Sequence, residues 1–220
     1  MIASNAVEEY LEMIYRLEEE EGVAKTNKLV KILGVAKGTV TNAVERLERL
    51  SLVTHSPYKG VRLTRKGRAI ALRVIRRHRL SECLLTEILK VEWEAAHESA
   101  CLLEHSVTDE IADKIESVLR NPKTCPHGNP IPKSDGSLYE DASQSLVDLG
   151  SGRRCVVTKI VNESPAILQN LKTLNIRPGT RVEVLEGCSA EGSMKIRLQE
   201  GEHRLSREVA SSIRVRGAEE

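Results

Sequence analysis

The chain has 220 residues, 40% of them hydrophobic and 30% charged, a composition typical of a soluble globular protein with about two or three small domains. No apolar run is long enough for a membrane span and the first residues are not signal-like, which argues against a membrane protein and predicts a cytoplasmic one. The net charge of +1 hides a basic block, because residues 24–79 hold 15 Lys or Arg against two acids, and such a block predicts binding to a polyanion.

Helical spacing of apolar residues dominates the first 50 positions. An amphipathic helix is predicted over residues 5–20, with its end at Gly22. A short helix follows from Thr26, and Gly34 provides a tight turn into a second helix that starts near Lys37. Two helices joined by a short turn that contains Gly form a helix-turn-helix motif, although other amphipathic helix pairs share this pattern.

The segment that follows makes the pattern more specific. Residues 52–64, LVTHSPYKGVRLT, read as two short strands around a Pro and Gly turn, which is a β-hairpin. Helix, turn, helix and hairpin in this order predict a winged helix. A long helix is then predicted over residues 64–90 and another over 91–105. Ser106 and Asp109 match the capping box of a further helix.

The last third of the chain changes character. Residues 121–147 separate the helical part from the end of the chain. Within them, residues 124–137, TCPHGNPIPKSDGS, are rich in Pro and Gly without a period, which predicts a linker or an ordered loop. Short β-rich runs split by Gly and charged turns follow, with one short helix among them. This pattern over about 70 residues predicts a small barrel of SH3-like size.

Residues 97–105, HESACLLEH, are unusual for a helix. They combine two His, two Glu and one Cys with only two Leu. In a helix, Cys101, Glu104 and His105 lie at i, i+3 and i+4 on one face, which is either a solvated surface or a set of metal ligands. The five cysteines are scattered and form no CxxC pair, so reduced thiols are expected rather than a disulfide framework.

The order of the segments carries a family resemblance. EEYLEMIYRLEEEEG, the winged helix, RRHRLSECLL, AHESACLLEH, GNPIP and the β-rich end together resemble the diphtheria toxin repressor family of iron- and manganese-dependent regulators. The segment LNIRPGTRVEVLEG also resembles the FeoA-type, SH3-like domain of the longer, iron-sensing members. The resemblance implies a mainly α protein with a small β domain. It places a winged helix-turn-helix at 1–73, a helical metal-binding and dimerisation domain at 74–140 and an SH3-like barrel at 148–217.

The resemblance also implies two metal sites. The primary site falls on Glu9, Cys101, Glu104 and His105, and the ancillary site falls on His78, Glu82 and His97. The C-terminal domain should add ligands, but the matching positions hold Ser164 and Ile167, with Glu163 one residue away as the candidate. Each residue taken singly has an ordinary reading as a surface charge or a buried side chain, and the whole set in order favours ligands. A thiolate ligand favours Fe(II), Co(II), Ni(II) or Zn(II) over Mn(II), and the FeoA-like end points to Fe(II).

The implied function is that of a homodimeric repressor that binds double-stranded operator DNA when metal is bound and controls metal homeostasis genes. It is not an enzyme and has no small-molecule substrate. Phosphate contacts are expected from Lys37, Thr39, Lys59 and Arg62, base contacts from Thr41 and Asn42, and Lys25 and Lys28 belong to the same basic surface.

Other functions stay open at this point. A Mn(II) sensor of the same family is one, and a metal-independent DNA binder with a structural zinc site is another, which chelators should not affect. A metal hydrolase is disfavoured because the sequence has neither an HExxH motif nor a nucleophile elbow. The C-terminal domain could also dock a partner protein.

Overall fold

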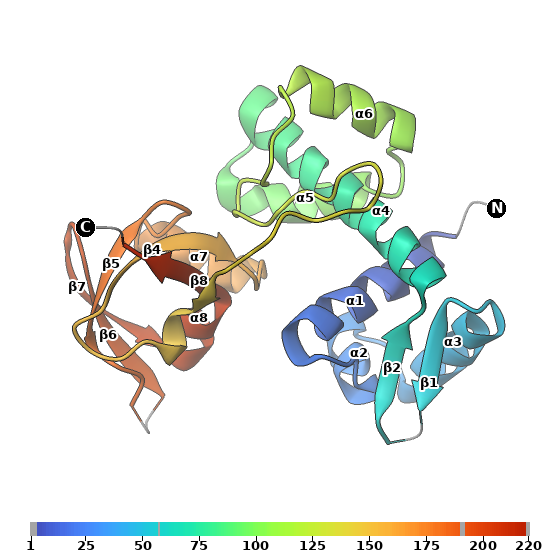
Figure 1. Ribbon diagram of the computed structural model, residues 1–220, viewed down its shortest axis with the longest axis horizontal. Coiled ribbons are helices and arrows are strands. Elements are labelled where there is room, and N and C mark those ends of the chain that lie inside the picture. The colour runs from blue at the N-terminus through green and yellow to red at the C-terminus, as the bar shows by residue number, and fades with distance from the viewer. Residues whose placement is uncertain (1–3, 57, 190–191, 219–220) are drawn as a thin grey trace. The chain divides into compact units, whose positions relative to one another are not determined.

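A computed structural model describes residues 4–56, 58–189 and 192–218 (Figure 1). The chain divides into two compact units. The first comprises Met1–His78, Leu103–Asp113 and Pro132–Ser137, and the second comprises Arg79–Leu102, Lys114–Ile131 and Leu138–Glu220. Among the described residues, no helix is long and apolar enough to span a bilayer.

The first unit contains the predicted winged helix. Its elements are α1 (Asn5–Glu21), α2 (Thr26–Leu33), α3 (Lys37–Arg49), β1 (Val53–Ser56) and β2 (Gly60–Leu63). Gly22 and Gly34 take the left-handed backbone conformation that ends α1 and α2, with φ of 74° and 64°. The two strands pair antiparallel, with Val53 opposite Leu63. The helix-turn-helix and hairpin expected from the sequence are therefore confirmed.

Helix α1 is packed firmly on this winged helix. Leu11 and Leu17 of α1 are buried in one core with Val44 of α3. Glu18, near the end of α1, accepts a hydrogen bond from the backbone N–H of Leu63 at 2.9 Å. Any side chain carried by α1 is thus fixed relative to the DNA-binding elements.

The long helix expected over residues 64–90 consists of two parts. Helix α4 covers Arg65–Cys83, and a π-helical turn, η1, covers Leu84–Ile88. The Thr86 hydroxyl donates a hydrogen bond to the carbonyl of Glu82 at 2.9 Å. This bond satisfies a carbonyl group where the backbone hydrogen bonds change from the α-helical to the π-helical pattern. Helix α4 begins in the first unit and ends in the second.

The next helices differ slightly from the prediction. Residues Trp93–Ala95 form a 3-10 turn (η2), α5 covers Ala96–Leu103 and α6 covers Asp109–Val118. The hydroxyl of Thr108 accepts a hydrogen bond from the backbone N–H of Ile111 at 3.2 Å, so Thr108 caps α6. The capping box at Ser106 is therefore wrong, because Ser106 closes the turn after α5 by donating to the Leu103 carbonyl.

The second unit contains an antiparallel sheet, which we call the C-terminal barrel. Its strands are β3 (Gln144–Ser145), β4 (Arg154–Ile160), β5 (Arg181–Glu186), β6 (Ser193–Leu198), β7 (Gly201–Ser206) and β8 (Ile213–Gly217), in the order β3-β8-β4-β5-β6-β7. A 3-10 turn, η3 (Leu146–Asp148), and two helices, α7 (Pro165–Thr173) and α8 (Arg207–Ser212), accompany it. Leu168 and Leu171 of α7 are fully buried in one core with Val157 and Val184 of the strands. The predicted SH3-like domain is confirmed.

The Pro and Gly segment is an ordered loop that packs on β4. The carbonyl of His127 accepts from the backbone N–H of Ile160 at 2.8 Å. Gly128 has φ of +85°, and a Cβ atom there would meet the Thr158 carbonyl oxygen at 2.1 Å. This close approach fixes the side chains of the loop against the barrel.

Candidate metal centre

Three of the predicted ligands meet in the first unit. Glu9 of α1 lies beside Glu104 and His105, which follow α5, and their ligand atoms lie within 4.8 Å of one another. The Nε2 atom of His105 is 3.4 Å from Glu9 Oε2 and 3.3 Å from Glu104 Oε1. Carboxylate oxygens and an imidazole nitrogen suit a divalent first-row metal. We call these three residues the first cluster.

Buried charges surround the first cluster. Burial raises the pKa of Glu104, although His78, whose Nδ1 lies 2.6 Å from Glu104 Oε2, opposes the rise. Burial also acts on Glu12, but the adjacent Arg16 and His78 lower its pKa overall. Burial lowers the pKa of His105, and Glu8, Glu104 and Glu9 more than offset this, so the pKa rises. A metal cation must therefore displace protons held by Glu104 and His105 in order to bind the first cluster.

Two further predicted ligands, Cys101 and His78, each lie beside other ligand-type residues of their own unit. The Cys101 thiol is exposed, and its Sγ is 3.8 Å from Nε2 of His97 in the second unit. Among the described residues, the cluster around Glu9 does not include it. His78, expected in the ancillary site, lies with Glu12 and Glu104 in the first unit, with ligand atoms within 4.8 Å.

The sequence reading missed the buried acids of α1. Glu8 and Glu12 are both buried, one turn apart on the same helix. They follow Val7 and Leu11 directly, so they lie on the border of the apolar face of α1. This position in the sequence is the feature from which their burial could be predicted.

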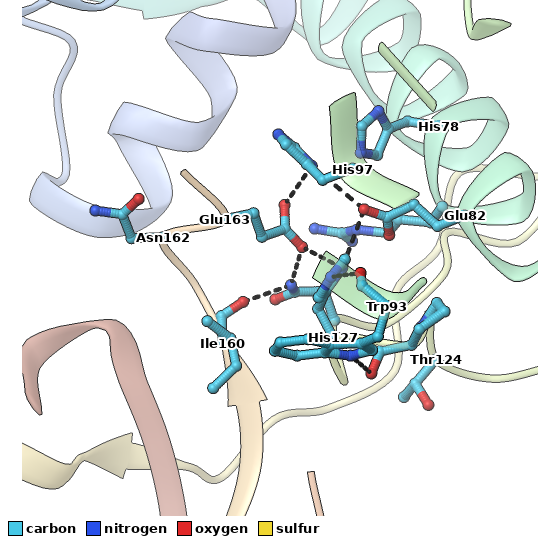
Figure 2. Close-up of polar contacts among 12 residues, drawn as sticks. His78, Glu82, Trp93, His97, Thr124, His127, Ile160, Asn162 and Glu163 are labelled. Atoms are coloured by element: carbon cyan, nitrogen blue, oxygen red, sulfur yellow. Dashed lines mark hydrogen bonds and ion pairs between the residues drawn. The ribbon is translucent and has the colours of Figure 1, made fainter. Parts of the chain in front are cut away.

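A second group of ligand-type residues lies wholly within the second unit. Glu82 of α4, Cys125 and His127 of the loop and Glu163, which lies between β4 and α7, are all buried, with ligand atoms within 4.8 Å. Figure 2 shows three of them, Glu82, His127 and Glu163. We call these four residues the second cluster. His97 lies beside it, with Nδ1 3.3 Å from Glu82 Oε1 and from Glu163 Oε2.

Neighbouring groups fix the orientation of the second cluster. The Nε2 atom of His127 lies 3.1 Å from the Trp93 carbonyl oxygen, so it donates there, and Nδ1 faces Glu82 at 3.1 Å. The Asn129 amide donates to Glu163 Oε1 and to the Ile160 carbonyl, both at 2.7 Å. These contacts, which Figure 2 shows, set a nitrogen and two carboxylates toward one point before any cation arrives.

The thiol of the second cluster is held in its neutral form. Burial, and then the charges of Glu82 and Glu163, raise the pKa of Cys125 well above its ordinary value. Only a strong Lewis acid would convert such a thiol into a thiolate ligand at neutral pH. The donor set of two carboxylates, one imidazole and one thiol fits a borderline divalent cation.

Three residues expected at the ancillary site belong to the second unit. Glu82 and His97 lie together, and Glu163, the candidate from the C-terminal domain, lies with them. Ser164 caps α7 and Ile167 is buried in the barrel core, so neither is placed as a ligand. Cys125 and His127 were missed because their segment reads as a linker, and the Cys-x-His spacing was the only signal.

The predicted DNA-contacting residues all lie exposed on the winged helix. They are Lys25, Lys28, Lys37, Thr39, Thr41, Asn42, Lys59 and Arg62. Two of them have contacts within the protein, because the Thr41 hydroxyl donates to the Lys37 carbonyl at 3.0 Å and Lys28 pairs with Glu21. Asn42 is exposed on α3, the second helix of the helix-turn-helix.

A winged helix with a basic exposed surface, together with two clusters of metal-ligand residues, defines a metal-responsive DNA-binding protein. Comparison with known proteins agrees. The family model described as "Iron dependent repressor, N-terminal DNA binding domain" matches residues 3–61. The model of the "metal binding and dimerisation domain" matches 64–133, and the FeoA domain model matches 144–217.

Whole-chain relatives agree with these matches. The chain is 34% identical to the iron-dependent repressor IdeR of Mycobacterium leprae, covering 96% of both chains. It is 31% identical to the diphtheria toxin repressor of Corynebacterium glutamicum, covering 98% of this chain and 97% of that one. A solved manganese-dependent transcriptional repressor in complex with manganese superposes with a TM-score of 0.87 at 29% identity, covering 96% of this chain and all of the other. The structure of T. acidophilum IdeR gives 0.84 at 27% identity, with 96% and 97% covered.

The chain belongs to the iron-dependent repressor family, which includes the diphtheria toxin repressor. Members are DNA-binding transcriptional repressors and not enzymes, so the chain is a metal-dependent transcriptional repressor. The family resemblance and the class of function expected from the sequence are confirmed.

Proposed function

We propose that this repressor binds operator DNA as a homodimer when Fe(II) occupies the first cluster, with the second cluster as a further metal site. The observation that carries this proposal is the position of Glu9. Glu9 lies on α1, which packs on the winged helix. Its carboxylate lies close to Glu104 and His105, which are not part of the winged helix. A cation held there would join the DNA-binding elements to the helical region.

The protein groups act as follows. Glu9 and Glu104 are acids that face one space, and without metal only the single charge of a protonated His105 offsets their mutual repulsion. The hold on α1 is therefore loose until more positive charge is added. A bound divalent cation would supply that charge and coordinate bonds. Glu9 then restrains α1, and α1 restrains β2 through the hydrogen bond from Leu63 to Glu18. The free energy of metal binding thus differs between two arrangements, which shifts their populations.

Iron is the first choice for the metal. Cys125 gives the second cluster a thiol, and a set of S, N and O donors favours Fe(II) or its heavier neighbours over Mn(II). Two relatives, 34% and 37% identical to this chain, are named iron-dependent repressors. Mn(II) is the alternative, since the first cluster has only oxygen and nitrogen donors and several structural neighbours are named for manganese. Co(II), Ni(II) and Zn(II) also fit the donor sets.

A homodimer is proposed from exposed apolar side chains. The segment matched by the dimerisation model has exposed large apolar residues, among them Ile88, Leu89, Leu102 and Val118. A contiguous exposed apolar surface marks a protein interface, and the match to the dimerisation model supports such an interface in this segment. A homodimer places two winged helices on DNA, so an operator with two related half-sites is expected.

The test is metal-dependent DNA binding. We expect binding to the promoter of the protein's own gene, followed by fluorescence anisotropy under anaerobic conditions, to strengthen at least about tenfold when EDTA is replaced by the activating metal, a coupling of about 1.4 kcal/mol. Comparing Fe(II), Mn(II) and Zn(II) identifies the signal. Equal binding in EDTA would contradict the proposal and favour a plain DNA binder with a structural metal.

Metal binding at the second cluster should release protons in a pH-dependent way. Burial lowers the pKa of His127, but Glu82 and Glu163 raise it more. The ring therefore stays protonated and charged at pH values above its ordinary pKa. This protonated form stabilises the metal-free fold fully below the ordinary pKa, and the stabilisation is lost as pH rises through the raised value. Apparent metal affinity should rise over the same window.

Calorimetry checks this expectation. Zn(II) titrations in two buffers of different ionisation enthalpy should show fewer protons released as pH rises through the His127 pKa, leaving the Cys125 proton as the remainder. Trp93, the single tryptophan, has its ring 4.8 Å from that of His127 and reports the event by fluorescence. Proton release that does not change with pH would rule out a protonated His127.

The roles of the DNA-contacting residues can be separated. We expect Asn42→Ala to weaken operator binding by roughly 1–3 kcal/mol and to leave nonspecific binding nearly unchanged. Lys59→Ala should weaken binding to any duplex and reduce the slope of affinity against salt by about one. Titrations on operator and scrambled DNA at several salt concentrations measure both, and each variant serves as the control for the other. An equal loss on both duplexes for Asn42→Ala would contradict base readout.

A further inference from the structure

Glu8, the residue before the proposed ligand Glu9, lies at the opposite edge of the same imidazole ring. The Nδ1 atom of His105 is 2.9 Å from Glu8 Oε2, whereas Nε2 is 3.4 Å from Glu9 Oε2. Two successive carboxylates of α1 therefore hold one histidine, one at each ring nitrogen. When His105 binds a metal, the two carboxylates cannot have the same role, because the ligating nitrogen needs its lone pair and the nitrogen that donates a hydrogen bond needs its proton.

The surroundings separate the two roles. Both oxygens of Glu8 are engaged, since Oε1 pairs with Arg77 Nη2 at 2.8 Å and Oε2 faces His105. Arg77 also donates to the Val107 carbonyl at 3.4 Å, so the pair is fixed to the protein. The Glu8 side chain is 9% exposed, against 45% for Glu9. Glu8 is a buried, fully bonded carboxylate, and Glu9 is an accessible one.

We infer that Glu8 is a positioning residue for the first cluster. It accepts the Nδ1 proton of His105 and so leaves the Nε2 lone pair directed toward Glu9 and Glu104, while Arg77 holds Glu8 in place. The inference rests on the proposed metal role of Glu9, Glu104 and His105. A carboxylate behind a ligating histidine fixes its tautomer and ring orientation and makes it a stronger base toward the metal.

The alternative role for Glu8, as a ligand itself, fits the contacts less well. A guanidinium 2.8 Å from one of its oxygens repels any cation brought to the same carboxylate. The ligand atoms of Glu9, Glu104 and His105 converge within 4.8 Å, and no group of convergent ligands found among the described residues includes Glu8.

The test uses the full chain with ¹⁵N-labelled histidine, loaded with Zn(II), which is diamagnetic. Long-range ¹H–¹⁵N NMR spectra show which ring nitrogen binds metal, and His105→Ala assigns the signals. Titration with a competing chelator, followed at the His105 signals, measures affinity at this cluster alone. In the unsubstituted protein we expect Zn(II) at Nε2 and a retained proton at Nδ1.

Three variants carry the expected differences. Glu8→Ala should lower Zn(II) affinity at His105 by about 10- to 100-fold and lose the protected Nδ1 proton. Glu8→Gln should keep Nε2 coordination with a smaller loss, because the carboxamide oxygen still accepts the Nδ1 proton. Arg77→Gln should weaken binding by several-fold without touching the ring. Glu98→Ala, which removes an exposed acid of α5, is the matched control and should change nothing.

The outcomes distinguish the two levels of proposal. If the His105 signals do not respond to Zn(II), the proposed metal cluster itself fails. If they respond but Zn(II) sits at Nδ1, or if the Glu8 and Arg77 variants bind as tightly as the parent, only the positioning role is overturned. Thermal unfolding of each variant shows whether it is folded, and the isosteric Glu8→Gln variant keeps the test decisive if Glu8→Ala does not fold.

Discussion

Glu9→Ala should abolish the metal dependence of DNA binding while leaving the basal, metal-free affinity nearly unchanged. The substitution removes the carboxylate of α1 whose ligand atom lies within 4.8 Å of those of Glu104 and His105. Without it, a cation can still bind the other two residues but has no first-cluster ligand on α1. The gain in operator affinity on adding metal should fall from at least about tenfold to less than about twofold, a loss of roughly 1 kcal/mol of coupling.

The control keeps the charge change and moves it along the same helix. Glu19 is an exposed acid of α1 that pairs with Arg68 at 3.4 Å near the other end of the helix. Exposed pairs of this kind contribute little to stability, so Glu19→Ala should behave as the parent does. Anisotropy titrations with and without metal compare the two variants. A Glu9→Ala protein that still gains tenfold in affinity would show that the first cluster does not carry the signal.

Much of the fold was predictable because its signals are local. The apolar spacing of α1 and the left-handed glycines Gly22 and Gly34 fix where the first helices end. The hairpin β1–β2 is marked by its turn residues. Where two local solutions differ little in free energy, the prediction failed. Thr108, which directly precedes α6, is the cap in the structure, whereas the backbone N–H of Ser106 closes the turn after α5.

The second cluster was only half predictable, for a physical reason. Glu82 and Cys125 are separated by 42 intervening residues, and they meet because the loop returns to β4. That return depends on Gly128, whose positive φ and absent Cβ allow contact with the Thr158 carbonyl. The periodicity of the sequence does not predict a contact of this kind between a loop and a distant strand. The first cluster was more accessible to prediction, since Glu104 and His105 are adjacent and the resemblance supplied Glu9.

Cys101 shows the limit of transferring a motif. In the sequence it stands three residues before Glu104, and helical spacing favours one common face. In the structure α5 ends at Leu103, so Glu104 and His105 lie in a turn rather than on the helix. The thiol stays exposed beside His97 while the acid is buried with His78. The end of α5, and not the residue spacing, decides which side chains meet.

Leu102→Asp should dissociate the homodimer and with it most operator binding. Leu102 lies on α5 and is 82% exposed, in a segment matched by the dimerisation model. In a two-fold interface each substitution occurs twice, so a charge placed there is desolvated on both sides. We expect the dimer dissociation constant to rise by at least about 100-fold, a loss of about 2.7 kcal/mol.

Sedimentation over a range of protein concentrations measures this loss directly. Ile32, an exposed apolar residue of α2, lies outside the matched segment, and Ile32→Asp serves as the control for adding one acid to an exposed helix. Because each monomer would engage one half-site only, operator affinity should fall together with dimerisation, while Zn(II) binding at His105 within each chain should persist. A Leu102→Asp protein that sediments as the parent does would place the interface elsewhere on the helices, and the remaining exposed residues, Ile88, Leu89 and Val118, would then be the ones to substitute.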